Sequence, residues 1–213
     1  MTKPISRSEP RRFVAHSGFL NLREVEVMRL LFLIIVAGGM IVPIAQAQSG
    51  DVYIRQAGSV IEAEIEQIGS NHSANIEQTG NSLELELLQD GSQNNAEIDQ
   101  SGNNNNLDLS QIGNENDLAI DQQGNGNTIT LRQEGDDNLA DFVQVGSNNI
   151  ASALQFGSGN TVSVNQVGDS NRSEDVQRGN NNRIVKTQEG TGWYADVEQN
   201  GNGLSVEIVQ RGN

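Results

Sequence analysis

The tripeptide Gln-x-Gly recurs every eleven residues along this chain, with no insertion or deletion between the first copy and the last. A fixed period of this length is typical of a stacked repeat, in which each unit buries its apolar face only against its neighbours. A disordered polar chain has no reason to keep such a period in phase. The fifteen glutamines are Gln56, Gln67, Gln78, Gln89, Gln100, Gln111, Gln122, Gln133, Gln144, Gln155, Gln166, Gln177, Gln188, Gln199 and Gln210.

We number each eleven-residue unit from its Gln as position 1 and call the equivalent positions of all units a column. Further columns then hold one kind of residue. Position 8 is apolar in thirteen of the fourteen complete units and position 10 in twelve, whereas positions 7, 9 and 11 are mostly polar. This alternation predicts a strand with one buried face. Position 6 is Asn in nine consecutive units: Asn94, Asn105, Asn116, Asn127, Asn138, Asn149, Asn160, Asn171 and Asn182.

Position 3 is Gly in every unit, and text such as "GNGN" and "GSGN" around it predicts a turn. Gly adopts positive φ without steric cost, which suits a turn residue. The turn glycines are Gly58, Gly69, Gly80, Gly91, Gly102, Gly113, Gly124, Gly135, Gly146, Gly157, Gly168, Gly179, Gly190, Gly201 and Gly212.

The expected fold is all-β: a parallel two-walled β-solenoid, of the cross-β type, with two eleven-residue strand-turn units per coil. Each strand then lies about 4.8 Å from the strand 22 residues earlier, in register. Buried Gln and Asn side chains are costly unless their amides are paired. Stacked on the same residue one coil away, they form the amide ladders that stabilise cross-β assemblies.

The N-terminal region has the pattern of a secretory signal. "MRLLFLIIVAGGMIVPIAQAQ" begins at Met28, is apolar from Leu30 to Ile44 and ends with small residues. The fifteen-residue apolar run is shorter than the roughly 20 residues of a comfortable membrane span, so export is favoured over a membrane anchor. We expect residues 1–47 to be removed, with Met28 as a possible true start, leaving a short lead at 48–55 and the repeat domain at 56–213.

Composition excludes several function classes. The net charge is −15, and removal of residues 1–47, which hold six basic and three acidic residues, makes it −18. Such a chain lacks the basic face that nucleic acid requires. The chain has no Cys, so its stability cannot come from disulfides.

No catalytic residue, metal site or cofactor is expected. The carboxylates recur along a regular surface, whereas glycosidic catalysis needs one pair in a cleft. His72 occupies a position 6, where a ladder substitution is a better interpretation than a ligand. The turns lack the Gly-Gly-x-Gly-x-Asp text of calcium-binding solenoids. The protein is therefore not expected to be an enzyme.

The repeat resembles the curlin repeat, found in subunits of curli, the extracellular amyloid fibres of Gram-negative bacteria. "QSGNNNNLDLSQIG" (100–113) and "QVGSNNIASALQFG" (144–157) carry the resemblance, which extends over residues 56–212. It implies a subunit that leaves the cell through an outer-membrane secretion pore and polymerises with itself and a second curlin-type subunit into biofilm matrix. The Gln series and Asn94 to Asn182 would be the ladder residues.

The role within such a fibre stays open between major subunit and nucleating subunit. Major subunits of this family carry a Gly-rich leader, whereas only "QSGDVYIR" stands between the expected cleavage site and Gln56. Nucleating subunits carry basic residues late in the chain, as here at Arg172, Arg178, Arg183, Lys186 and Arg211.

Two other functions compete with fibre assembly. A monomeric solenoid adhesin or ice binder would keep its ends capped and stay soluble, and an ice-binding face needs a flat outward array of Thr. A surface-layer or matrix glycan-binding protein would present outward aromatic residues. Thr is scattered in this chain, and Trp193 and Tyr194 form one isolated aromatic pair.

Charged residues also make specific predictions. Asp175 and Lys186 interrupt position 10 in consecutive units, so they should face each other across the core, as a pair or as gatekeepers that slow assembly. The 22-residue period also stacks like charges on the outer surface: Glu64, Glu86 and Asp108 on one wall, and Glu77, Asp99 and Asp121 on the other.

Overall fold

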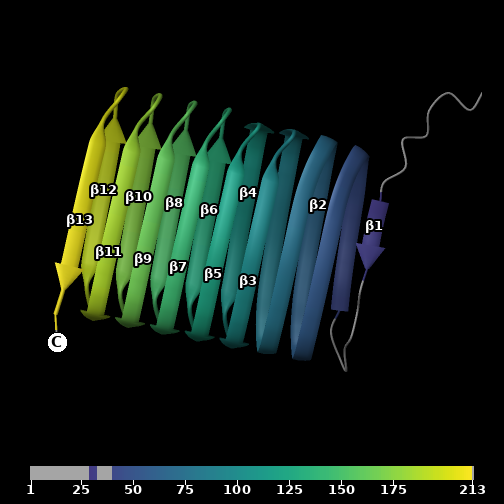
Figure 1. Ribbon diagram of the computed structural model, residues 1–213, viewed down its shortest axis with the longest axis horizontal. Coiled ribbons are helices and arrows are strands. Elements are labelled where there is room, and N and C mark those ends of the chain that lie inside the picture. Colours follow the sequence, from purple (N-terminus) through teal and green to yellow (C-terminus); the bar gives the residue numbers. More distant parts are fainter. Residues whose placement is uncertain (1–28, 33–39, 213) are drawn as a thin grey trace, which may run out of the picture.

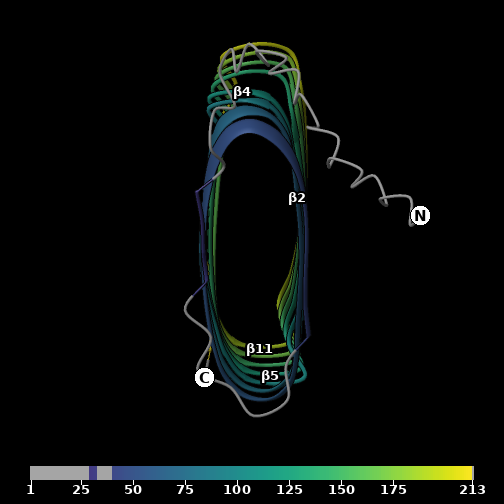
Figure 2. The same cartoon turned by 90° about the vertical axis from the view of Figure 1, so that its right-hand side faces the viewer.

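The computed structural model describes residues 29–32 and 40–212 of the protein, with side chains described from residue 50 onward. All regular structure in these ranges is β, in one sheet of thirteen strands. The strands lie side by side across the long axis of the molecule (Figure 1). Viewed along that axis, the chain winds as a flattened oval (Figure 2). The predicted β-solenoid is confirmed.

The strands alternate between two walls. β3, β5, β7, β9, β11 and β13 follow one another on the odd wall, and β4, β6, β8, β10 and β12 on the even wall. β2 contributes to both walls, because its 53 residues wind round more than two coils of 22. The bounds are β1 Arg29–Phe32, β2 Met40–Ser92, β3 Asn95–Asn103, β4 Asn106–Asn114, β5 Asp117–Asn125, β6 Thr128–Glu134, β7 Leu139–Ser147, β8 Ile150–Phe156, β9 Thr161–Asp169, β10 Arg172–Arg178, β11 Arg183–Thr191, β12 Tyr194–Asn200 and β13 Ser205–Arg211.

Every pairing is parallel with a register of 22 residues. Ile98 of β3 lies beside Ile76 of β2 and Ile120 of β5, and the other pairs follow the same offset. The eleven-residue unit thus supplies one strand, and two units close one coil. Identical columns stack on identical columns along the whole axis.

The core is a narrow layer between the walls. In β3 the burial pattern alternates strictly, and the buried residues are those at positions 8, 10 and 1. Position 8 and 10 side chains such as Leu107, Leu109 and Phe142 are at most 1% exposed. The two apolar columns predicted from the period of two therefore make the core. The glutamines from Gln56 to Gln199 are equally buried: Gln100 and Gln144 are 0% exposed.

The turns contain a second special position besides the glycine. Fourteen of the position-3 glycines, from Gly58 to Gly201, have φ values between 111° and 147°. Position 5 is left-handed in all fourteen turns between Gln56 and Leu204, with φ between 54° and 72°, although ten of these residues are not Gly. The sequence analysis missed position 5, because Asn, Ser, Asp, Gln and Glu share no obvious signature there.

The close stacking of turns explains why position 3 is never another residue. A Cβ on Gly113 would lie 2.0 Å from the carbonyl oxygen of Gly135 in the next coil, and Gly102 would meet Gly124 in the same way at 1.9 Å. The positive φ predicted for position 3 is thus only part of the reason why this position is Gly. The backbone of the next coil fills the space that a side chain would need.

Val60 is the one β-branched residue at position 5, with φ of 54° and a side chain 69% exposed. A left-handed conformation costs an L-residue about 1–2 kcal/mol, and less for Asn. We expect Val60→Asn to raise the free energy of unfolding by about 1 kcal/mol, measured by urea denaturation. Asn104→Val, the reverse exchange at an equivalent position, should lower it by a similar amount. A destabilising Val60→Asn would show that Val60 makes a contact worth more than the strain.

The predicted secretory segment falls largely outside the described residues, which exclude 1–28 and 33–39. The described part is strand: β1 pairs with Asp51–Ile54, again with a 22-residue offset, and 40–47 belong to β2. Val52 and Ile54, in the predicted lead, occupy the apolar columns and are 4% and 0% exposed. Removal of residues 1–47 stays a prediction.

Candidate functional site

Two ladders of Gln side chains run through the core, one along each wall. On the odd wall the Nε2 of each Gln donates to the Oε1 of the Gln 22 residues later, from Gln56 to Gln210, over 2.7–3.0 Å. The even wall repeats this from Gln67 to Gln199, over 2.7–3.1 Å. All thirteen bonds point the same way, so each ladder is a chain of aligned amide dipoles.

The second N–H of the Gln amide ties the two walls together. In eleven of the glutamines, from Gln89 to Gln210, Nε2 also donates to the backbone carbonyl 16 residues earlier, on the opposite wall, over 3.0–3.3 Å. A primary amide has two donors and one carbonyl acceptor. This geometry satisfies both donors inside an otherwise dry core, which removes the cost of burying the amide.

The Asn column works differently from the predicted ladder. Each of the nine Asn side chains accepts, at Oδ1, the backbone N–H of the residue 22 positions later, over 2.9–3.1 Å. Its Nδ2 donates to the carbonyl of a turn glycine in the next coil, over 2.8–3.0 Å. Direct side-chain bonds occur at three steps, such as Asn116 to Asn94. Asn has one methylene fewer than Gln, so its amide reaches the backbone of the turn.

His72 takes the place of an Asn in this column, as predicted. Its Nδ1 accepts the backbone N–H of Asn94 at 3.3 Å, and its Nε2 lies 3.0 Å from the carbonyl of Ile68. These contacts require the neutral tautomer with the proton on Nε2. The ring is 2% exposed and serves as a turn brace.

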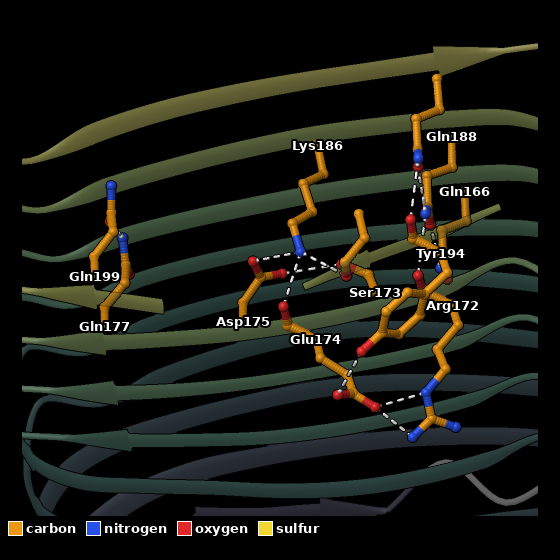
Figure 3. Close-up of polar contacts among 12 residues, drawn as sticks. Gln166, Arg172, Ser173, Glu174, Asp175, Gln177, Lys186, Gln188, Tyr194 and Gln199 are labelled. Carbon is orange, nitrogen blue, oxygen red and sulfur yellow. Dashed lines mark hydrogen bonds and ion pairs between the residues drawn. The ribbon is translucent and has the colours of Figure 1, made fainter. Parts of the chain in front are cut away.

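Asp175 and Lys186 face each other across the core, as predicted (Figure 3). Nζ of Lys186 lies 2.8 Å from Oδ1 of Asp175 and donates to the carbonyls of Glu174 at 2.8 Å and Ala195 at 3.0 Å. The Ser173 hydroxyl donates to Oδ2 of Asp175 at 3.0 Å. Burial raises the pKa of the Asp175 carboxyl, and the Lys186 charge offsets this only in part. Three polar residues thus replace apolar ones in one layer of the core.

The outer face of the odd wall carries the predicted line of like charges. Glu77 lies beside Asp99, and Asp99 beside Asp121, in consecutive coils. Burial is the main cause that raises the pKa of the Asp99 carboxyl, and the charges of Asp121 and Glu77 raise it further. The sequence analysis foresaw the repulsion but not that desolvation by neighbouring side chains has the larger effect.

This stack predicts a pH-dependent stability. Because the folded pKa of Asp99 is raised, the folded state binds a proton more readily than the unfolded chain, and stability rises as pH falls through that pKa. We expect Asp99→Asn to raise the free energy of unfolding at pH 7. The gain should vanish near pH 3, below the ordinary Asp pKa of about 3.9. Urea denaturation at both pH values measures it. An equal gain at both would mean that charge is not the cause.

Both ladders are open at their ends. At the N-terminal end, Oε1 of Gln56 and Oε1 of Gln67 are buried and accept no hydrogen bond from the described residues. The residues 22 positions earlier, Ile34 and Ala45, have no side-chain amide that could donate a hydrogen bond to these oxygens. At the other end, Nε2 of Gln199 and Nε2 of Gln210 each donate one hydrogen bond to a backbone carbonyl. The second N–H of each amide has no acceptor among the described residues. The sequence analysis did not foresee this polarity.

Among residues 29–32 and 40–212 no three His, Asp or Glu side chains converge as a metal site would require. The same ranges contain no helix that is both long and apolar enough to span a membrane.

Stacked parallel strands joined by buried amide ladders define a β-solenoid of the cross-β type. Residues 80–113, 113–141 and 135–168 match the Curlin associated repeat. Residues 80–168 of this chain therefore consist of curlin repeats. No curated protein matches the chain.

Proposed function

We propose that this protein is the structural subunit of an extracellular curli-like amyloid fibre, which grows by adding copies of the chain to the ends of the solenoid. The observation that carries the proposal is the pair of open Gln ladders. A buried acceptor without a donor costs about 1–3 kcal/mol, and the ends of a parallel sheet are templates for another strand. A second copy supplies the missing partner at both places.

The match to curlin repeats also supports a proposal for where the chain acts and with what partners. Curlin repeats support secretion across the outer membrane of a Gram-negative bacterium, through a dedicated pore, into the biofilm matrix. A second curlin-type subunit would start or continue the fibre, and the chain could fill either role. The fibre would serve adhesion and cell aggregation.

The last strand offers the direct test. The apolar Val206 and Ile208 of β13 are only partly buried, since no strand of the described residues lies beside β13 on its far side. Chain freed of residues 1–47 should form thioflavin-positive fibres with reflections at about 4.8 Å and about 10 Å. Ile208→Lys places a charge on the growing edge and should block fibre growth. Glu207→Lys, the matched control, places the same charge on the solvent side of the same strand and should leave growth intact.

The outcomes separate the candidate functions. Soluble monomers under all conditions would overturn fibre assembly and favour a monomeric secreted adhesin or glycan-binding solenoid. Equal growth of the two Lys variants would show that fibres form through another surface than the end of the solenoid.

A further inference from the structure

The two ends of the described solenoid lie on the same wall. The strand that carries Gln56 belongs to the odd wall, because Gln56 bonds to Gln78 beside β3. The last strand, β13, also belongs to the odd wall. From the strand 50–56 to β13 there are fifteen strands, one for each position-1 Gln. Two strands make one coil. The described repeat holds seven and a half coils.

The open ladder groups at the two ends match in number and kind. Gln199 and Gln210 offer one N–H each, on the even and the odd wall respectively. Gln56 and Gln67 offer one buried carbonyl oxygen each, and both are 1% exposed. Within the chain every ladder bond runs from a Gln to the Gln 22 residues later, so a donor end can continue only into an acceptor end.

We infer that successive copies stack head to tail with each copy turned by half a turn about the fibre axis. This inference rests on the proposed function. The next strand of an unbroken solenoid after β13 must lie on the even wall, beside β12. The second copy's strand 50–56, which its own fold places on its odd wall, takes that place. Gln199 then donates to Gln56 of the second copy, and Gln210 donates to Gln67 of the second copy.

The other columns agree with this register. Position by position, Val52 and Ile54 of the second copy cover Ala195 and Val197, which are the most exposed of the buried apolar core residues at 6% and 8%. Left-handed turn residues also coincide, since Gly203 and Val60 both have positive φ at position 5. The apolar columns and the turn conformations continue through the junction.

Charge favours the same register. Glu198 is exposed at position 11 on the even wall, and Arg55 is exposed at position 11 of the second copy's first strand. Half-turn stacking brings these opposite charges to neighbouring positions. Stacking without rotation would instead place Arg55 beside Val209, which has no charge.

Stacking without rotation also leaves a gap. The second copy's strand 50–56 would lie on β13, and its strand 61–67 would then stand about 9.6 Å from β12, twice the strand spacing. The N–H of Gln199 and the buried oxygen of the second copy's Gln67 would be too far apart to bond. A half coil would stay uncovered at every junction.

The N-terminal residues block this surface in the full chain. β1 pairs with Asp51–Ile54, where the last coil of the preceding copy would have to lie. Assembly therefore requires removal of the predicted secretory segment. A full chain with a protease site inserted after Ala47 allows assembly to be started by cleavage.

Cysteine cross-linking tests the junction, because the chain contains no Cys of its own. Equivalent positions on adjacent strands are about 4.8 Å apart, within the range that a disulfide spans. Arg55→Cys with Glu198→Cys should give a ladder of covalent oligomers after cleavage and oxidation. Arg55→Cys with Val209→Cys is the matched control and should give none. The exposed ion pairs lost at Arg55 and Glu198 contribute little to folding.

Helical symmetry gives a second readout. Cryo-electron microscopy of parent fibres should show a subunit rise of about 36 Å with a rotation near a half turn, apart from the gradual twist. Deleting one unit, residues 117–127, leaves fourteen strands. The rise should fall to about 34 Å and the half turn should disappear, while the cross-link between positions 55 and 198 persists.

The results distinguish this inference from the proposed function. Fibres cross-linked through positions 55 and 209, or a rotation unchanged by the deletion, would overturn the half turn but not fibre formation. If the cleaved parent chain forms no fibres at all, the proposed function fails and the half turn with it.

Discussion

Gly113→Ala is expected to prevent the solenoid from closing at that coil. The added Cβ would lie 2.0 Å from the carbonyl oxygen and 2.8 Å from the carbonyl carbon of Gly135. Both atoms are backbone, held in place by Asn116, whose Nδ2 donates to that same carbonyl at 2.8 Å. The φ of Gly113, +122°, adds strain for any L-residue. We expect a loss of more than about 4 kcal/mol in the free energy of unfolding, in the range of the most damaging single substitutions.

Gly192→Ala is the matched control. Gly192 also has positive φ, at +72°, but a Cβ there meets nothing within 4 Å. Its cost should be that of a left-handed Ala alone, about 1 kcal/mol. Urea denaturation of the monomer measures both. Similar small losses for the two variants would show that neighbouring coils can separate without cost, which would contradict the tight stacking of the turns.

Lys186→Ala is expected to destabilise the chain by about 3–5 kcal/mol, because it leaves the Asp175 carboxylate buried without its counter-charge. The Asp175 and Lys186 side chains are 1% and 0% exposed, so water cannot replace the lost partner. The double variant Asp175→Val with Lys186→Ile should fold at least as stably as the parent. Asp175 has Ala153 and Val197 as stacked neighbours, and Lys186 has Val164 and Ile208, so apolar replacements continue both columns.

Urea denaturation of the parent, Lys186→Ala and the double variant tests this pair. Equal losses for Lys186→Ala and the double variant would contradict the pairing. The same variants test the gatekeeper role, which the buried pair does not itself establish. If the pair slows assembly, the double variant should form fibres after a shorter lag than the parent, since it restores an unbroken apolar column.

The sequence alone determined the architecture. An eleven-residue period in phase with a period of two allows few arrangements, because strand and turn must repeat with each unit and single units cannot bury an apolar face. The same logic placed Asp175 opposite Lys186 and stacked Asp99 on Glu77. Both follow from counting residues, since Asp99 is one coil of 22 residues after Glu77, and Lys186 is one unit of eleven residues after Asp175, on the opposite wall.

Only the tertiary structure decided how the polar groups bond. Which group a side-chain amide bonds depends on which acceptor in the neighbouring coil is nearer. The Gln amides at position 1 donate to the side chain of the next Gln, whereas the Asn amides at position 6 donate to the backbone carbonyl of a turn glycine. The close contact at the position-3 glycines and the left-handed position 5 likewise depend on the spacing between coils. These contacts join residues that are distant in the chain. The repeat pattern in the sequence specifies neither the distance between two coils nor the direction of a hydrogen bond between them.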